Sequence, residues 1–223
     1  MNDKPFRSGF AALIGRPNVG KSTLVNAFVG AKVAIVSDKP QTTRHRIQAV
    51  LTRPDAQLVF IDTPGLHKPR HRLGAYMTQA AQSAIPDVDI VLFVVDGATG
   101  ITARDRWIAE RLAKVRTPIM LVVNKIDAIG TATDSPESGG PEQSPGAYEE
   151  PIVDIDALVE RFGDERVART VAPFLELGEF VAVWPVSAVT GQGLEELVDD
   201  IVRRLPEGPQ YFPEVWVTDR PEQ

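Results

Sequence analysis

The stretch Gly15–Ser22 constrains this chain more than any other part of its sequence. It reads Gly-Arg-Pro-Asn-Val-Gly-Lys-Ser and matches the pattern G-x-x-x-x-G-K-[ST]. The apolar run Phe10–Ile14 before it predicts a buried strand, and Thr23–Phe28 after it predicts a helix that ends at Gly30. A loop between a strand and a helix points several backbone N–H groups at one concavity, next to the positive end of the helix dipole. We therefore expect this loop to bind an anion such as a nucleotide phosphate.

Four residues of this loop have an expected task. Gly15 and Gly20 let the backbone turn and approach a phosphate without a Cβ in the way. Lys21 is expected to reach the β- and γ-phosphates, and the Ser22 hydroxyl to ligate Mg²⁺. A coincidental glycine turn is the alternative, but the pattern arises by chance in only about one in a hundred chains of this size. Three further residues complete the predicted phosphate-binding set: Asn18, Val19 and Thr23.

Composition narrows the remaining classes of protein. The chain has 223 residues, of which 43% are hydrophobic, and its 24 Lys and Arg against 30 Asp and Glu give a net charge of −6. Length and composition predict one α/β domain with its own core, which by itself is a poor candidate for bulk nucleic-acid binding. Since cysteine is absent, disulfides and thiolate metal sites are excluded. No apolar run approaches a membrane span and no signal peptide is recognisable, so we expect a soluble, cytoplasmic protein.

Asp62–Gly65, with the sequence Asp-Thr-Pro-Gly, is the second candidate site. The apolar stretches Ile47–Leu51 and Gln57–Ile61 flank a Pro-Asp turn and predict an antiparallel hairpin whose second strand ends at Asp62. A carboxylate there can hold Mg²⁺ through a water, and the Gly65 N–H can bond a γ-phosphate. Alone, the segment could be a plain strand-ending turn. About 40 residues beyond a phosphate loop, the binding role is favoured.

The third motif is Asn124–Asp127, which reads Asn-Lys-Ile-Asp and follows the buried apolar run Ile119–Val123. A carboxylate at Asp127 would accept two charge-assisted hydrogen bonds, from guanine N1–H and the 2-amino group, and adenine has no donors there. At about 1.5–3 kcal/mol each, these bonds favour guanine by at least about a hundredfold. The Lys125 stem can cover the base, and Asn124 can tie this loop to the phosphate loop. The alternative is a solvated loop at a strand end.

The remaining pattern predicts an α/β fold built around the phosphate loop. We expect a six-stranded, mostly parallel α/β sheet with helices on both faces and nucleotide beyond the carboxyl ends of its strands. After the last strand, the turn Ser187–Ala188 can offer a backbone N–H to guanine O6, although alone it would be an ordinary strand-to-helix turn. Residues 128–151, rich in Pro, Gly, Ser and Glu, predict a flexible insertion. Further predicted elements are strands over 89–96 and 180–184, and helices over 73–84, 104–115, 155–177 (broken near 163) and 193–205.

These motifs, in this order, resemble those of translation-factor-class P-loop GTPases. Within that class, Gly15–Ser22 and the sequence Gln-Thr-Thr-Arg-His-Arg at Gln41–Arg46 resemble the Era family of bacterial GTPases. Tyr211–Pro213 and Thr218–Glu222 resemble the Era segment that joins the G domain to a C-terminal KH domain. The resemblance covers nearly the whole chain but fails over 128–169, where Era proteins have a shorter connection. No KH domain follows, so we expect a fragment with a G domain over 1–206 and the start of a linker over 207–223.

The resemblance implies GTP hydrolysis coupled to a conformational switch, with GTP or GDP and Mg²⁺ as cofactors. It implies a role in assembly of the small ribosomal subunit, whose RNA would be contacted mainly through the KH domain. Thr43, rather than Thr42, would reach Mg²⁺ beside Ser22 and Asp62, and Lys21, Thr43 and Gly65 would form the catalytic set. Asn18 stands where some relatives coordinate K⁺, which makes K⁺ dependence a hypothesis. A monomer is expected, and peripheral membrane association stays open.

Three rival interpretations remain. The first is another GTPase of the same branch, such as a tRNA-modification or tandem-domain ribosome GTPase, against which Gln41–Arg46 argues. The second is a nucleotide-gated binding module with negligible turnover. Leu66 stands where Ras-like enzymes carry the Gln that orients water, so unassisted turnover should be about 10⁻³ s⁻¹ or less. The third is an ATPase, against which Asp127 argues.

Overall fold

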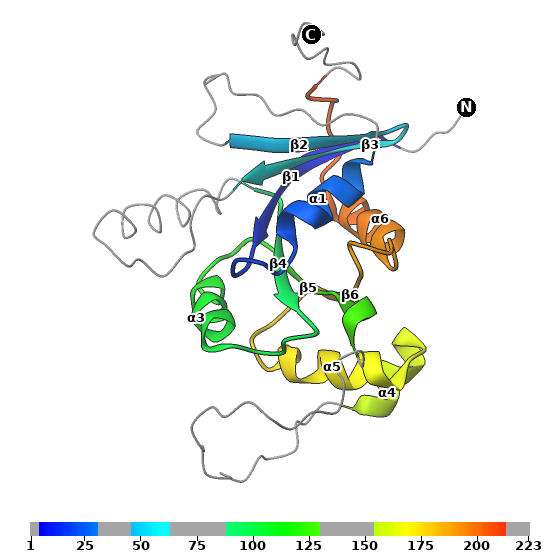
Figure 1. Cartoon of the computed structure of the whole chain (residues 1–223). Helices are drawn as coiled ribbons and strands as arrows, with labels where there is room; N and C mark the ends of the chain where they lie inside the picture. Colours follow the sequence, from blue (N-terminus) through cyan, green and yellow to red (C-terminus); the bar gives the residue numbers. More distant parts are fainter. Residues whose placement is uncertain (1–4, 31–45, 63–87, 130–153, 213–223) are drawn as a thin grey trace, which may run out of the picture.

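A computed structural model describes residues 5–30, 46–62, 88–129 and 154–212 as a six-stranded sheet with helices on both faces (Figure 1). The strand order is β2-β3-β1-β4-β5-β6, and every neighbouring pair is parallel except β2 and β3. The predicted architecture is therefore confirmed. The strands are β1 (Arg7–Ile14), β2 (Arg46–Arg53), β3 (Ala56–Asp62), β4 (Ile90–Asp96), β5 (Ile119–Asn124) and β6 (Ala182–Pro185).

Apart from one short 3₁₀ helix that was not predicted, the described helices agree with the predicted ones to within a few residues at their ends. The predicted break near Gly163 is present, because this glycine ends one helix in the left-handed region at a φ of 72°. The expected helix over 73–84 lies outside the described residues. The helices are α1 (Lys21–Val29), α3 (Ala103–Leu112), the short 3₁₀ helix η2 (Ile126–Ala128), α4 (Ile155–Phe162), α5 (Glu165–Leu175) and α6 (Leu194–Arg204).

The core consists of two apolar layers, one on each face of the sheet. On one face, α1 and α6 pack through residues such as Leu24 and Ile201, and on the other α3 and α5 pack through residues such as Ile108 and Val171. Successive residues of a strand point to opposite faces, so strands covered on both sides must be apolar throughout. This requirement explains why β4 and β5 read as continuous apolar runs whose every residue is buried.

Two strand ends differ from the expectation. β1 begins at Arg7 rather than Phe10, because the Arg7 N–H donates to Asp55 O (3.0 Å) and the Ser8 N–H donates to Pro206 O (3.1 Å). These backbone bonds to neighbouring segments leave no mark on apolar periodicity. The last strand begins at Ala182 rather than residue 180, after a Val181 side chain that is exposed.

The segment 206–212 leaves α6 and lies against the amino ends of β1 and β3. Gln57, fully buried at the start of β3, holds it: Oε1 accepts from the N–H groups of Tyr211 and Phe212 (2.9 Å each), and Nε2 donates to Phe212 O (2.8 Å). The Tyr211 ring also stacks on Phe10, with 5.2 Å between centroids. We call Gln57 and its two partners the Gln57 anchor. Tyr211 and Phe212 therefore dock on the domain.

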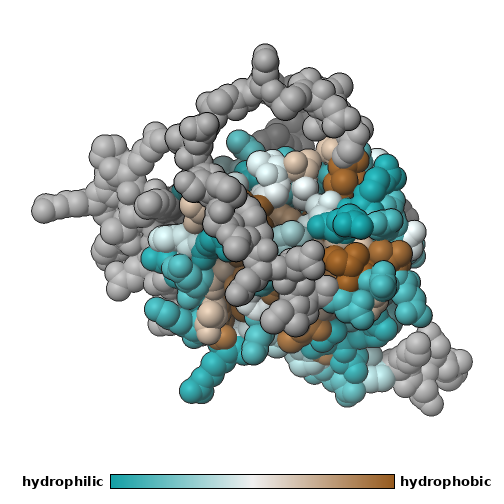
Figure 2. Space-filling model, turned by 90° about the horizontal axis from the view of Figure 1, so that it is seen from below, coloured by the Kyte–Doolittle hydropathy of each residue, from teal (hydrophilic) through white to brown (hydrophobic). Residues whose placement is uncertain are grey.

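On the face seen in Figure 2, apolar and hydrophilic residues are interspersed where the chain is described. Large apolar side chains that are exposed include Val181, Val189 and Tyr211. None of the helices in the described ranges is long and apolar enough to cross a membrane.

Candidate nucleotide-binding site

The phosphate loop connects the end of β1 to the start of α1, as predicted. A Cβ on Gly15 would lie 2.2 Å from Val94 O of β4, and a Cβ on Gly20 would lie 2.3 Å from Asn124 Nδ2. Gly20 also adopts a φ of 95°, which side chains disfavour. Both glycines are therefore required by the neighbouring strand ends as well as by the expected approach of a phosphate.

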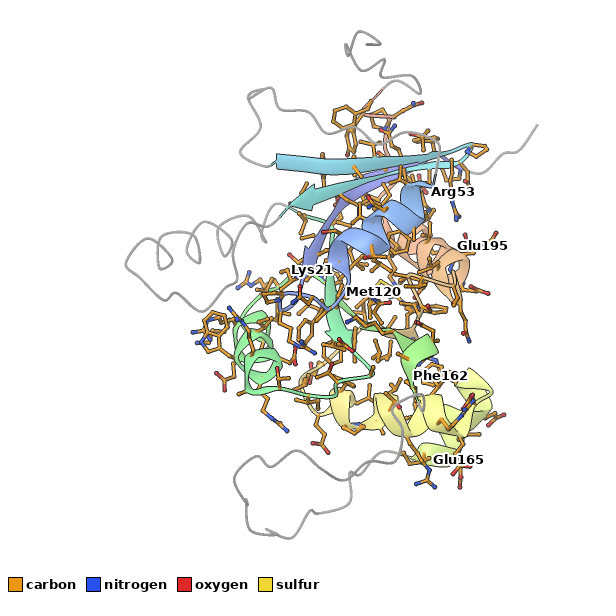
Figure 3. All side chains as sticks on the ribbon, in the orientation of Figure 1. Lys21, Arg53, Met120, Phe162, Glu165 and Glu195 are labelled. Carbon is orange, nitrogen blue, oxygen red and sulfur yellow. The ribbon has the colours of Figure 1, made fainter. Side chains whose placement is uncertain are left out.

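Lys21 lies at the first position of α1 and turns its side chain back over the loop (Figure 3). Its Nζ donates to Gly15 O (2.7 Å) and to Arg16 O (2.8 Å). The side chains of Ser22 and Thr23 are exposed at the same helix end. Because the first turn of α1 carries no acidic residue, nothing within it neutralises the positive end of the helix dipole. The loop thus presents a cation, a hydroxyl and a helix N-terminus together, which suits a phosphate.

One buried amide joins three of the predicted motifs. Asn124, the last residue of β5, is 1% exposed. Its Nδ2 donates to Val19 O in the phosphate loop (2.8 Å), and its Oδ1 accepts from the Ala188 N–H (3.0 Å). The predicted tie between Asn124 and the phosphate loop is therefore present. The same side chain also fixes Ser187–Ala188, a link that the sequence did not predict.

Asp127 has the opposite environment. It lies in η2, is exposed, and has no hydrogen-bond partner among the described residues. Its carboxylate oxygens are accessible to donors on a ligand. Ser187 is buried, and its Oγ accepts from the Thr190 N–H (3.0 Å), so the hydroxyl shapes the turn. The base-reading candidates therefore form a rigid frame with one exposed acceptor.

Asp96 is a site residue that the sequence analysis missed. It ends β4 between the strands that carry the two loops, and it is 3% exposed. Oδ2 accepts from Lys125 Nζ (2.6 Å), and Oδ1 accepts from the N–H groups of Ala98 and Thr99 (3.1 Å each). Burial would raise the pKa of Asp96, but the hydrogen bonds from Lys125 and Thr99 outweigh it and hold the pKa below 3.8. A lone aspartate after an apolar strand carried no motif by which to recognise this role.

Arg16, also missed, joins the phosphate loop to two buried carboxylates. Its Nη2 lies 3.6 Å from Asp96 Oδ2, and its Nε lies 3.4 Å from Asp105 Oδ2. Asp105 is fully buried and caps the start of α3, where its Oδ2 accepts from the N–H (2.9 Å) and Oγ1 (2.6 Å) of Thr102. Arg16 therefore links the phosphate loop to α3 as well as to β4.

The other predicted site residues are placed only in part. Asp62 is the last residue of β3, at the same edge of the sheet as Asn124 and Asp96. Asn18 is exposed in the phosphate loop and adopts a φ of 65°. Four residues with predicted roles lie outside the described residues: Thr42, Thr43, Gly65 and Leu66. Most of the expected insertion over 128–151 also lies outside them.

Together, the doubly covered parallel sheet, the strand–loop–helix at Gly15–Ser22 and the loops at the carboxyl ends of β5 and β6 define a G domain of the P-loop nucleotide-binding class. The sequence family described as "50S ribosome-binding GTPase" matches residues 10–125, and the chain belongs to this family. The candidate base-binding residues Asp127 and Ser187–Ala188 lie in the second half of the chain, outside the matched range.

Individual relatives support the predicted resemblance to Era. The chain is 43% identical to GTPase Era of Alkaliphilus metalliredigens over 218 residues, which is 98% of this chain and 63% of the relative. A crystal structure of Era in complex with MgGDPNP and nucleotides 1506–1542 of 16S ribosomal RNA superposes with a TM-score of 0.68 at 34% identity, covering 97% of this chain and 63% of the other. Aquifex aeolicus Era bound to GDP and AlF4⁻ gives a TM-score of 0.67 at 33% identity with the same coverage. The chain thus spans a little under two thirds of these relatives.

Proposed function

We propose that this protein binds and hydrolyses GTP and uses the two nucleotide states as a conformational switch. The observation that carries the proposal is Asn124, a buried amide that fixes the phosphate loop and the Ser187–Ala188 turn around one exposed carboxylate, Asp127. This arrangement suits a ligand with phosphates at one end and hydrogen-bond donors at the other, and guanine offers two donors where adenine has none.

Mg²⁺ fits the residues at the phosphate end. This ion prefers hard oxygen ligands, and the exposed Ser22 hydroxyl is one. Asp62, the last residue of the adjacent strand β3, would supply a carboxylate. We propose that Ser22 ligates Mg²⁺ directly and that Asp62 contacts it through a water. Thr43 would ligate Mg²⁺ only when a γ-phosphate is present. When bound, Mg²⁺ would neutralise charge on the β- and γ-phosphates.

Lys21 and Gly65 complete the proposed chemistry. The Lys21 ammonium, now held by two loop carbonyls, would turn to the β- and γ-oxygens and stabilise the charge that develops there. The Gly65 N–H would sense the γ-phosphate. Leu66 can neither donate nor accept a hydrogen bond, so turnover without a partner should be slow, at about 10⁻³ s⁻¹ or less.

K⁺ dependence extends this proposal. Asn18 is exposed in the phosphate loop in the left-handed conformation, so its side-chain oxygen is accessible to a cation near the phosphates. We expect faster hydrolysis in KCl than in NaCl at matched ionic strength. Equal rates would remove K⁺ from the mechanism.

The cellular role is proposed from the relatives. Because an Era protein binds a 16S ribosomal RNA segment, we propose that the protein containing this chain acts in assembly of the small ribosomal subunit, in the cytoplasm and as a monomer. The net charge of −6 suggests that RNA is held mainly by parts outside these 223 residues. In an anisotropy titration with small-subunit RNA at about 150 mM salt, these residues should bind at least about tenfold more weakly than a full-length relative.

The test of the nucleotide proposal is a direct titration of the chain with GTP, GDP and ATP. We expect both guanine nucleotides to bind at least about a hundredfold more tightly than ATP. Equal affinities would contradict the proposal. Single-turnover hydrolysis of GTP then separates a slow GTPase from a binding module that does not turn over.

A further inference from the structure

We infer that Asp96 is a positioning residue of the nucleotide site, whose carboxylate holds Lys125 and Arg16 in place and thereby couples the base loop to the phosphate loop. The inference rests on the proposed guanine-nucleotide function and adds to it a residue outside the recognised motifs.

The position of Asp96 in the sheet gives it access to both loops. β4 lies between β1, which leads into the phosphate loop, and β5, which leads into the base loop. Asp96 ends β4 and is in register with Asn124 of β5. A side chain at this point can therefore reach one loop on each side.

The two carboxylate oxygens of Asp96 have separate partners. Oδ1 accepts the N–H groups of Ala98 and Thr99, which builds the oxygen into the turn after β4 and fixes the plane of the carboxylate. Oδ2 accepts from Lys125 Nζ at 2.6 Å and lies 3.6 Å from Arg16 Nη2. One oxygen therefore anchors the group, while the other faces a cation from each loop.

The Arg16 side chain has little else to compensate its burial. Within the described residues, its Nε and Nη2 are buried without a hydrogen bond, so Asp96 and Asp105 supply the charge that balances them. The Arg16 carbonyl in turn accepts from Lys21 Nζ. Fixing Arg16 therefore also fixes one of the two carbonyls that orient Lys21.

Loss of the Asp96 charge has a defined consequence. In Asp96→Asn, Oδ1 can still accept the two turn N–H groups, but an NH₂ would face the two cations. Lys125, whose side chain is 36% exposed, would then swing into water and release the base loop. Among the described residues, Asp96 Oδ2 faces Lys125 and Arg16 and reaches Lys21 only through Arg16, so the main loss should be in nucleotide affinity rather than in the hydrolytic step.

The experiment compares Asp96→Asn, Lys125→Met and the double variant in GDP affinity, GTP turnover and thermal unfolding. Asp96→Ser serves as a second variant, since a short hydroxyl can keep the turn while removing the charge. Asp200→Asn is the matched control: Asp200 is also a buried carboxylate, but it accepts from Trp184 Nε1 (2.9 Å) and pairs with Arg204, and neither partner belongs to the phosphate loop or the base loop.

We expect Asp96→Asn and Lys125→Met each to raise the Kd for GDP about tenfold, and the double variant to raise it little further, because the two residues act as one unit. KM for GTP should rise in parallel while kcat stays within about threefold. Asp200→Asn should bind GDP like the parent. The inference is overturned if the losses of GDP affinity multiply in the double variant, or if the Kd for GDP is unchanged in both Asp96 variants. It is also overturned if Asp200→Asn loses as much GDP affinity as Asp96→Asn.

Unfolding without nucleotide separates this inference from the proposed function. If Asp96 and Lys125 form one unit, their effects on Tm are also non-additive, and additive shifts overturn the inference whatever the nucleotide data show. If the parent chain binds ATP as well as GDP, the proposed function fails instead, and the unfolding cycle still decides whether Asp96 holds Lys125.

Discussion

Two buried amides at opposite ends of the sheet show how similar chemistry can serve different purposes. Asn124 lies at the carboxyl end of β5 and bonds the phosphate loop and the Ser187–Ala188 turn. Gln57 lies at the amino end of β3 and bonds the backbone of Tyr211 and Phe212. Each donates once to a backbone carbonyl of a distant segment and accepts from a backbone N–H.

The difference lies in the groups that surround each amide. Around Asn124 the structure presents an exposed carboxylate, Asp127, and the exposed hydroxyl of Ser22. Around Gln57 the hydrogen bonds close on the protein itself, and the nearby Ser8 hydroxyl donates to Pro209 O (2.7 Å). Accessible polar groups on a rigid frame are expected of a ligand site, whereas polar groups that satisfy one another mark a structural joint.

The largest expected effect is that of Lys21→Ala at the phosphate end. Removal of the ammonium takes away the positive charge expected at the β- and γ-oxygens, so we expect GTP hydrolysis to fall by about 10²–10³-fold or more and triphosphate binding to weaken. Turnover assays and a GTP titration measure both. Lys114→Ala, which changes an exposed lysine after α3, should keep parental activity. GTP hydrolysis by Lys21→Ala at the parental rate would show that the loop has a function other than the proposed one.

Asn124→Ala should follow in size and should reduce affinity and stability together. The variant leaves Val19 O and the Ala188 N–H without their partner in a buried place, at about 1–3 kcal/mol each. We expect GDP affinity to fall about tenfold or more, since three loops lose their shared tie. Isothermal titration and thermal unfolding measure the two effects. A loss of stability without a loss of GDP affinity would show that Asn124, like Gln57, has a purely structural role.

Gln57→Ala should lower stability alone. The change removes the acceptor shared by the Tyr211 and Phe212 N–H groups, and we expect a loss of about 1–3 kcal/mol in the free energy of unfolding. GDP affinity should stay within about twofold of the parent, because β3 meets the nucleotide edge only at its other end. Denaturant unfolding and a GDP titration are the measurements. A large affinity loss would break the distinction between the two amides.

The smallest effect is expected at Asp164, outside both ends of the sheet. Its side chain caps α5, and the hydrogen bond from the Arg166 side chain, together with the Arg166 N–H, holds the pKa of Asp164 below 3.8. Because the folded pKa is depressed, the ionised group contributes stability above pH 3.8 that is lost as pH falls through the folded pKa. Asp164→Asn should be slightly less stable than the parent at pH 7 and equal to it in strong acid. Glu160→Gln, at an exposed position of α4 beyond its first turn, is the control and should keep parental stability at pH 7.

The sequence predicted those parts of the molecule that local chemistry determines. Apolar runs marked the strands because the sheet is covered on both faces, and the phosphate loop and Asn124–Asp127 were recognisable because their spacing is short and fixed. Asp96, Arg16 and Gln57 were not predicted. Each acts through partners distant in the sequence, such as Lys125 for Asp96 and Tyr211 for Gln57, and only the sheet order brings those partners together.

We propose above all that the fold exposes the Asp127 carboxylate as the acceptor that recognises guanine, and Asp127→Asn tests this most directly. An amide at this position donates where the carboxylate accepted, so it suits xanthine rather than guanine. Titrations with GDP and XDP should show GDP affinity reduced by more than about tenfold and XDP affinity increased, with Tm unchanged because Asp127 is exposed and has no partner among the described residues. Unchanged GDP affinity in this variant would contradict the account.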